Sequence, residues 1–124
     1  MKMMRQVLLA DDNSDLRSAL RLLLETRLDV TLITEAHDME HAMSQAEDTF
    51  PDCIVLDWEL PGRPKRDRIQ VLRALVPGTH IIVTSARPEA RDEALANGAD
   101  QFAGKTDAPD ALLDAIRTCC AAKD

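Results

Sequence analysis

Short apolar runs alternate along the chain with stretches in which apolar residues recur at helical spacing. Five such strand-then-helix units follow one another, a pattern typical of an α/β protein with a parallel sheet covered by helices on both faces. The predicted strands are Val7–Ala10, Val30–Thr34, Cys53–Leu56, Ile81–Thr84 and Gln101–Gly104. The predicted helices begin near Asn13 or Ser14, near Asp38, near Asp67, at Pro88 and at Pro109, the fourth ending at Asn97 before a stop at Gly98.

Size, charge and composition narrow the possible classes. The 124 residues suit one domain, and the five units leave none for a linker, so we expect a single domain over residues 1–124 with no output domain. A net charge of −7 and 2% aromatic residues disfavour nucleic-acid binding. The apolar runs are too short for a membrane span or a signal-peptide core, which predicts a cytoplasmic protein. We expect Cys53, Cys119 and Cys120 to be small buried residues rather than disulfides or zinc ligands.

Polar side chains that could bind a ligand or react with one lie at or directly after the ends of four of the five predicted strands. Ligands of open parallel sheets bind outside the carboxyl ends of the strands, so groups placed there converge in space. The residues at these positions are Asp11 and Asp12 after the first strand, Asp57 after the third, Thr84 and Ser85 at the end of the fourth, and Lys105 after the fifth.

Three carboxylates gathered at one edge repel one another unless a cation lies between them. Mg²⁺ prefers oxygen ligands and binds through one or two carboxylates together with a phosphate, and Mn²⁺ has similar preferences. An ionised aspartate beside such an ion is also a competent nucleophile that can form an aspartyl phosphate. The metal, Lys105 and a hydroxyl could each bind one oxygen of a phosphoryl group. The set of residues therefore predicts phosphoryl transfer to a carboxylate, Asp57.

The whole chain resembles the receiver domain of two-component response regulators. The residues that carry this resemblance are Leu9-Ala10-Asp11-Asp12-Asn13, Ile54-Val55-Leu56-Asp57, Leu60-Pro61-Gly62, Val83-Thr84-Ser85-Ala86, Gly98-Ala99-Asp100 and Phe102-Ala103-Gly104-Lys105. The resemblance implies a flavodoxin-like sheet in the order 2-1-3-4-5. It also implies a regulatory phosphoacceptor that catalyses only its own phosphorylation and slow dephosphorylation, with a histidine kinase or a histidine phosphotransfer protein as donor.

The resemblance assigns a role to each site residue. Asp57 would be the phosphorylation site, and Lys105 would pair with the phosphoryl group. Ser85 or Thr84 would be the switch hydroxyl, with Ser85 favoured because the small Ala86 follows it, and Phe102 would be the switch aromatic on the surface of the fourth helix, fifth strand and fifth helix. A downstream protein, whose identity the sequence does not give, would bind that surface. The metal ligands would be Asp12 directly, Asp11 mainly through water, Asp57, and Glu59 through its backbone carbonyl.

Two departures from the family pattern and several alternatives accompany this interpretation. Thr106 follows the lysine where the family usually has proline, and the stretch from Ser85 to Gly98 is about two residues shorter than is common.

A phosphorylation-independent interaction module and an aspartyl-phosphate phosphohydrolase are the alternative functions. The charged loop from Arg63 to Arg68 is expected to be a solvated surface more than a partner contact. Glu59 and Arg87 could pair beside the phosphoryl group and lengthen its lifetime.

Overall fold

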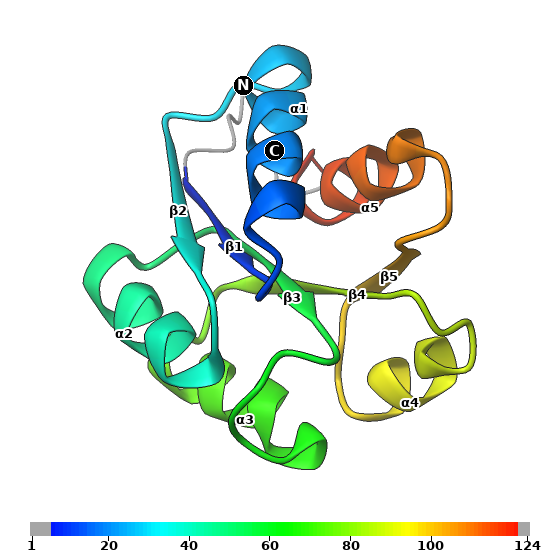
Figure 1. Cartoon of the computed structure of the whole chain (residues 1–124). Coiled ribbons are helices and arrows are strands. Elements are labelled where there is room, and N and C mark those ends of the chain that lie inside the picture. The colour runs from blue at the N-terminus through cyan, green and yellow to red at the C-terminus, as the bar shows by residue number, and fades with distance from the viewer. Residues whose placement is uncertain (1–5, 122–124) are drawn as a thin grey trace.

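Five parallel strands form one sheet, with helices on both of its faces (Figure 1). The structure, a computed structural model, describes residues 6–121, and the side chains of residues 6–119. The order of the strands is β2-β1-β3-β4-β5, as predicted. The elements are β1 (Gln6–Ala10), α1 (Ser14–Arg27), β2 (Leu32–Ala36), α2 (Met39–Thr49), β3 (Cys53–Asp57), α3 (Lys65–Leu75), β4 (His80–Ser85), α4 (Ala90–Ala96), β5 (Gln101–Gly104) and α5 (Pro109–Ala121).

The sheet separates two apolar cores. In Figure 1, α1 and α5 lie above the sheet, whereas α2, α3 and α4 lie below it. Alternate residues of the buried strands face opposite cores, as the two-residue repeat of a strand requires. On β3, for example, Ile54 and Leu56 face the core between the sheet and helices α2, α3 and α4. Cys53 and Val55 face the core between the sheet and helices α1 and α5. The central strands are thus buried on both faces, which explains their uninterrupted apolar runs.

Local signals in the sequence define several helix ends. Asn13 caps α1, since its side-chain oxygen accepts the N–H of Leu16 at 3.0 Å. Asp38 caps α2 in the same way, accepting the N–H of His41 at 2.7 Å. Gly98 follows α4 with φ +105°, a backbone angle that favours glycine, and so ends the helix where expected.

Three elements begin two residues away from their predicted starts, while the bounds predicted for the other strands and helices agree to within one residue. The second strand lies two residues further along, at Leu32–Ala36, because its register with β1 pairs Gln6 with Leu32 and Ala10 with Ala36. The third helix begins at Lys65 rather than Asp67. The fourth helix begins at Ala90, so Pro88 is not its first residue; the preceding residues form a tight turn in which the N–H of Ala90 donates to the carbonyl of Arg87.

Cys53 and Cys119 are buried and carry no disulfide, as expected, while the Cys120 side chain lies outside the described residues. None of the helices within residues 6–121 combines the length and apolar character needed to cross a bilayer. Every peptide bond in the described chain is trans, including the bond between Lys105 and Thr106.

Candidate functional site

Three aspartates meet at the carboxyl edge of the sheet. Asp57 is the last residue of β3, and Asp11 and Asp12 directly follow the neighbouring strand β1. One carboxylate oxygen from each of them lies within 4.8 Å of the others. Asp11 and Asp57 are 4% and 2% exposed, whereas Asp12 is exposed to solvent. The convergence expected from the strand ends is therefore present, with one acid of the three open to solvent.

Lys105 bridges the two buried acids. Its Nζ lies 2.8 Å from Asp11 Oδ2 and 3.3 Å from Asp57 Oδ1. The lysine directly follows β5, and its backbone N–H donates to the carbonyl of Ser85 at 2.9 Å, which ties it to the end of β4. The ammonium, which follows β5, thus lies between a carboxylate that follows β1 and a carboxylate at the end of β3.

The pKa values of Asp57 and Lys105 are both raised, but by different causes. Burial raises the pKa of Asp57, and the neighbouring charge of Asp11 adds to the increase. The backbone N–H of Glu59 and the ammonium of Lys105 favour the ionised form, but they offset only part of the effect, so the pKa of Asp57 lies above its ordinary value. For Lys105 burial alone would lower the pKa; the hydrogen bond to Asp11 and the charge of Asp57 outweigh it, so its pKa is raised.

The donor set suits a hard divalent cation. Asp11, Asp12 and Asp57 offer carboxylate oxygens only, and oxygen is the ligand that Mg²⁺ and Mn²⁺ prefer. Burial, together with the charge of Asp11, keeps the pKa of Asp57 above its ordinary value despite the Lys105 ammonium, so a cation bound here would favour the ionised carboxylate. Glu59 follows on the loop after β3, and its N–H donates to Asp57 Oδ1 at 3.0 Å, so the loop folds back onto the acid.

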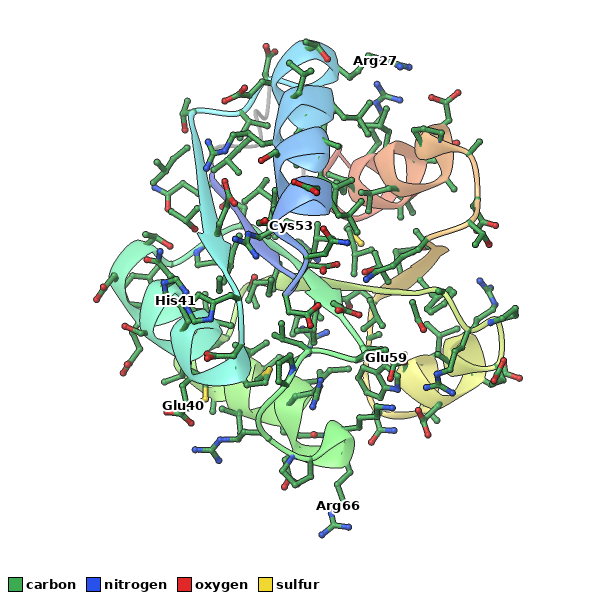
Figure 2. All side chains as sticks on the ribbon, in the orientation of Figure 1. Arg27, Glu40, His41, Cys53, Glu59 and Arg66 are labelled. Carbon is green, nitrogen blue, oxygen red and sulfur yellow. The ribbon has the colours of Figure 1, made fainter. Side chains whose placement is uncertain are left out.

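A second charged cluster forms around Glu59, which lies between the end of β3 and α4 (Figure 2). Glu59 is at its centre: Lys65 Nζ lies 2.8 Å from Glu59 Oε1, and Arg87 Nε and Nη2 lie 3.0 and 2.9 Å from Glu59 Oε2. Ser85 Oγ donates to the same Oε2 at 3.2 Å and accepts the N–H of Arg87 at 3.0 Å. Burial alone would raise the pKa of Glu59, but hydrogen bonds from Lys65 and Arg87 outweigh it, so the pKa is lowered.

The two candidate hydroxyls lie in different environments. Ser85 contacts Glu59 and Arg87, as just described, and borders a cavity of about 200 Å³ whose lining includes Phe102. Phe102 is half-buried and packs against the core on the α2, α3 and α4 side of the sheet. Thr84 instead lines a largely apolar cavity of about 290 Å³ between α1 and α5, together with Lys105.

Arg68 is the clearest residue that the sequence interpretation placed wrongly. It was expected on a solvated loop, yet it is 3% exposed and its guanidinium donates to backbone carbonyls of the loop after β3. Its spacing of four residues from the buried Leu72 places both on one face of α3, and this was the signal available in the sequence. The rest of the charged loop agrees better with the prediction: Arg66 is exposed and points away from the body of the molecule (Figure 2).

Two further contacts were not anticipated. Trp58, directly after Asp57, is fully buried, and its indole N–H donates to Glu93 Oε1 on α4. On the other side of the site, Arg17 Nη1 donates to the backbone carbonyl of Asp11 at 2.6 Å while its Nε binds Glu35 at 2.8 Å. The first contact joins the residue after Asp57 to α4, and the second joins Asp11 itself to α1; neither follows from a short sequence pattern.

Comparison with known proteins agrees with this arrangement. The family model described as "Response regulator receiver domain" matches residues 7–117. The chain is 32% identical over 117 residues to the nitrate/nitrite response regulator protein NarL of Escherichia coli K12, covering 93% of this chain and 54% of that protein. It is 30% identical over 119 residues to the phosphate regulon transcriptional regulatory protein PhoB of Klebsiella pneumoniae, covering 93% and 51%. The chain thus spans about half the length of these relatives.

Solved structures show the same fold. A two-component response regulator of the LuxR family from Aurantimonas superposes with a TM-score of 0.85 at 26% identity, over 94% of this chain and 85% of the other. Family model, sequence relatives and fold agree over nearly all of the described chain. The chain therefore belongs to the response regulator receiver domain family of two-component systems.

Proposed function

We propose that Asp57 accepts a phosphoryl group from the phosphohistidine of a histidine kinase or a histidine phosphotransfer protein. Mg²⁺, or Mn²⁺, would be held by Asp11, Asp12, Asp57 and the backbone carbonyl of Glu59. The observation that supports this most strongly is the Lys105 ammonium, 2.8 Å from Asp11 and 3.3 Å from Asp57. It places a fixed positive charge where the charge of a transferred phosphoryl group would need compensation.

The reaction is a displacement at phosphorus. An oxygen of the Asp57 carboxylate forms a bond to phosphorus as the bond from phosphorus to the donor's imidazole nitrogen breaks; the electron pair leaves with the imidazole, which takes up a proton. When bound, the divalent ion neutralises charge on the carboxylates and on the phosphoryl oxygens. Lys105 moves its hydrogen bond from the carboxylate to a phosphoryl oxygen, and its raised pKa keeps it protonated for that role.

The signal leaves the site through Ser85. In this structure its hydroxyl donates to Glu59, so a phosphoryl group on Asp57 would compete for that hydroxyl. Moving Ser85 toward Asp57 releases one of the contacts that hold Glu59 against Arg87, and Arg87 lies at the start of the segment leading to α4. Phe102 borders the same cavity as Ser85 and has space to follow, which would change the surface formed by α4, β5 and α5. A downstream protein would bind that surface.

Trp58 supplies a second connection to α4. Its indole N–H donates to Glu93, and its backbone N–H donates to the carbonyl of Thr84 at 2.8 Å. The residue after the acceptor is therefore hydrogen-bonded both to β4 and to α4. A shift of the loop after β3 and a shift of α4 are consequently coupled, which supports α4 as part of the signalling surface.

Incubation with acetyl phosphate and Mg²⁺, followed by intact-mass measurement, tests the function. We expect the mass of one phosphoryl group to be added to the wild-type chain and none to Asp57→Asn, with no addition when the divalent ion is removed by chelation. Absence of uptake by the wild-type protein would instead favour the phosphorylation-independent module. Continuous release of phosphate from small phosphoesters would favour a phosphohydrolase.

A further inference from the structure

A buried arginine underlies the loop that follows the acceptor. Arg68, on the first turn of α3, donates from Nη1 to the carbonyls of Trp58 and Leu60, at 3.0 and 2.9 Å. Its Nη2 donates to the carbonyl of Arg63. One guanidinium thus binds three carbonyls spread over the loop between β3 and α3. Hydrogen bonds from a charged donor are about twice as strong as neutral ones, so this contact defines the path of the loop.

The spacing of the two carbonyls bound by Nη1 is informative. Trp58 and Leu60 flank Glu59, the residue whose carbonyl is the proposed ligand of the divalent ion. Because each peptide unit is planar, holding the carbonyls on both sides leaves the intervening peptide little freedom to rotate. The Leu60 N–H, which belongs to the same peptide unit as the Glu59 carbonyl, donates to the carbonyl of Asp57 at 3.0 Å. In the preceding unit, the Glu59 N–H donates to Asp57 Oδ1 at 3.0 Å. The orientation of the Glu59 carbonyl is therefore set by its neighbours.

Packing alone does not explain a charge at this position. Removing a guanidinium from water is costly, and an apolar side chain of similar volume would fill the same space without that cost. Arg68 lies 5.8 Å from the centre of the Trp58 ring, and its Nε has no hydrogen-bond partner among the described residues. Two of its nitrogens are nevertheless committed to the loop, which indicates that the geometry of the loop is what the arginine provides.

We propose that Arg68 is a positioning residue that holds the loop after β3 so that the Glu59 backbone carbonyl is presented to the divalent ion. The inference rests on the proposed function for the ion, but not on the phosphodonor or on the later signalling steps. It predicts that loss of the guanidinium weakens binding of the metal even while the three aspartates and Lys105 remain in place.

The same helix contains a matched control. Arg73 also donates to backbone carbonyls, those of Thr79 at 3.1 Å and Gly98 at 2.8 Å, and it pairs with Asp100. These partners lie beside the amino ends of β4 and β5, at the opposite edge of the sheet from Asp57. Arg73→Met therefore removes a comparable set of hydrogen bonds from α3 without touching the loop after β3.

Calorimetric titration of the full chain with Mg²⁺ alone, with thermal unfolding of each variant, tests the proposal. We expect Arg68→Met to weaken Mg²⁺ binding about ten-fold or more, the effect typical of residues that orient metal ligands. Arg73→Met should lower the unfolding temperature but change the Mg²⁺ affinity less than about two-fold, because Arg73 orients no proposed metal ligand. Arg68→Lys, which keeps the charge and can reach one carbonyl, should fall between wild type and Arg68→Met.

Unchanged affinity in Arg68→Met, or equal losses in Arg68→Met and Arg73→Met, would overturn the proposal. Should Arg68→Met fail to fold, Arg68→Gln is judged by the same criterion, because its shorter side chain does not reach the carbonyls. Wild-type protein that does not bind Mg²⁺ overturns the proposal as well. Wild-type protein that binds Mg²⁺ but takes up no phosphoryl group contradicts the phosphoacceptor function alone, and the comparison of the arginine variants still decides the role of Arg68.

Discussion

The two edges of the sheet use aspartates in different ways. At the amino edge, Asp52 accepts the N–H of Gln6 at 3.0 Å and Asp100 accepts the N–H of Ile81 at 2.8 Å, so each acid joins its own segment to the start of another strand. At the carboxyl edge, Asp11 and Asp57 accept N–H groups only two residues further along their own loops and share the ammonium of Lys105.

The difference separates acids that join strands from the acids that we propose bind the divalent ion. An acid that links two strands contributes to stability through hydrogen bonds to backbone groups that would otherwise lack partners. Asp11 and Asp57 accept backbone N–H groups only from their own loops, and together with Asp12 they lie close enough to repel, which leaves an excess of negative charge for a cation to neutralise. Within residues 6–121, the carboxyl edge holds the one set of three acids placed to share a metal ion.

The largest effect is expected at the carboxyl edge. Lys105→Met removes the ammonium between Asp11 and Asp57, and we expect phosphoryl uptake from acetyl phosphate to slow by about 100-fold or more, the range found when a preorganised charge-stabilising group is lost. Intact-mass measurement over time gives the rate. Asp100→Asn at the amino edge is the control and should leave the rate unchanged; equal slowing in both variants would erase the distinction between the edges.

The amino edge should instead affect stability. Asp100→Ala removes the acceptor of the Ile81 N–H and the partner of Arg73, and we expect the free energy of unfolding to fall by about 1–2 kcal/mol, after allowing for the partial exposure of the carboxylate. Urea unfolding measures the loss. The folded variant should take up the phosphoryl group at the wild-type rate. A variant that folds stably but takes up no phosphoryl group would contradict a purely structural role for Asp100.

A smaller effect is expected from the pair beside the site. Arg87→Ala removes both contacts between its guanidinium and Glu59, which we propose shield the phosphoryl group from water. We expect the phosphoryl group to be lost about two to five times faster, in line with the modest strength of exposed ion pairs. Decay after removal of the phosphodonor gives the half-life. Arg66→Ala, at an exposed position of the same region, should not alter it; a half-life unchanged by Arg87→Ala would refute the shielding role.

The smallest effect concerns Glu35, an acid near the carboxyl edge that is well compensated. Burial alone would raise its pKa, but hydrogen bonds from Arg17 and Arg21 outweigh it and lower the pKa below the ordinary glutamate value. Glu35 therefore stabilises the fold above the pKa that it has in the unfolded chain, and this contribution is lost as the pH falls through its lower pKa in the folded state. Unfolding at several acidic pH values should show a smaller pH dependence for Glu35→Gln than for the wild-type protein.

The sequence located the aspartates, Lys105 and the hydroxyls because each interrupts an apolar run, and parallel strands bring such interruptions to one edge. Arg68 was missed for a physical reason: its partners are backbone carbonyls, which every residue has, so no pair of side chains identifies the contact. The shift of β2 was missed because register with β1 determines its bounds, and this depends on pairing between strands rather than on the apolar pattern. The contact between Trp58 and Glu93 was missed because the two residues lie 35 positions apart in sequence, and their distance in space depends on how α4 packs.

The position of Trp58 has a practical consequence for spectroscopy. The chain contains one tryptophan and no tyrosine, so its indole dominates the near-ultraviolet absorption and the intrinsic fluorescence. That ring is fully buried, follows Asp57 directly and is hydrogen-bonded to α4 through Glu93. Emission from the unlabelled protein thus reports on a single location, and an optical titration observes the acceptor and the helix beside it without an introduced dye.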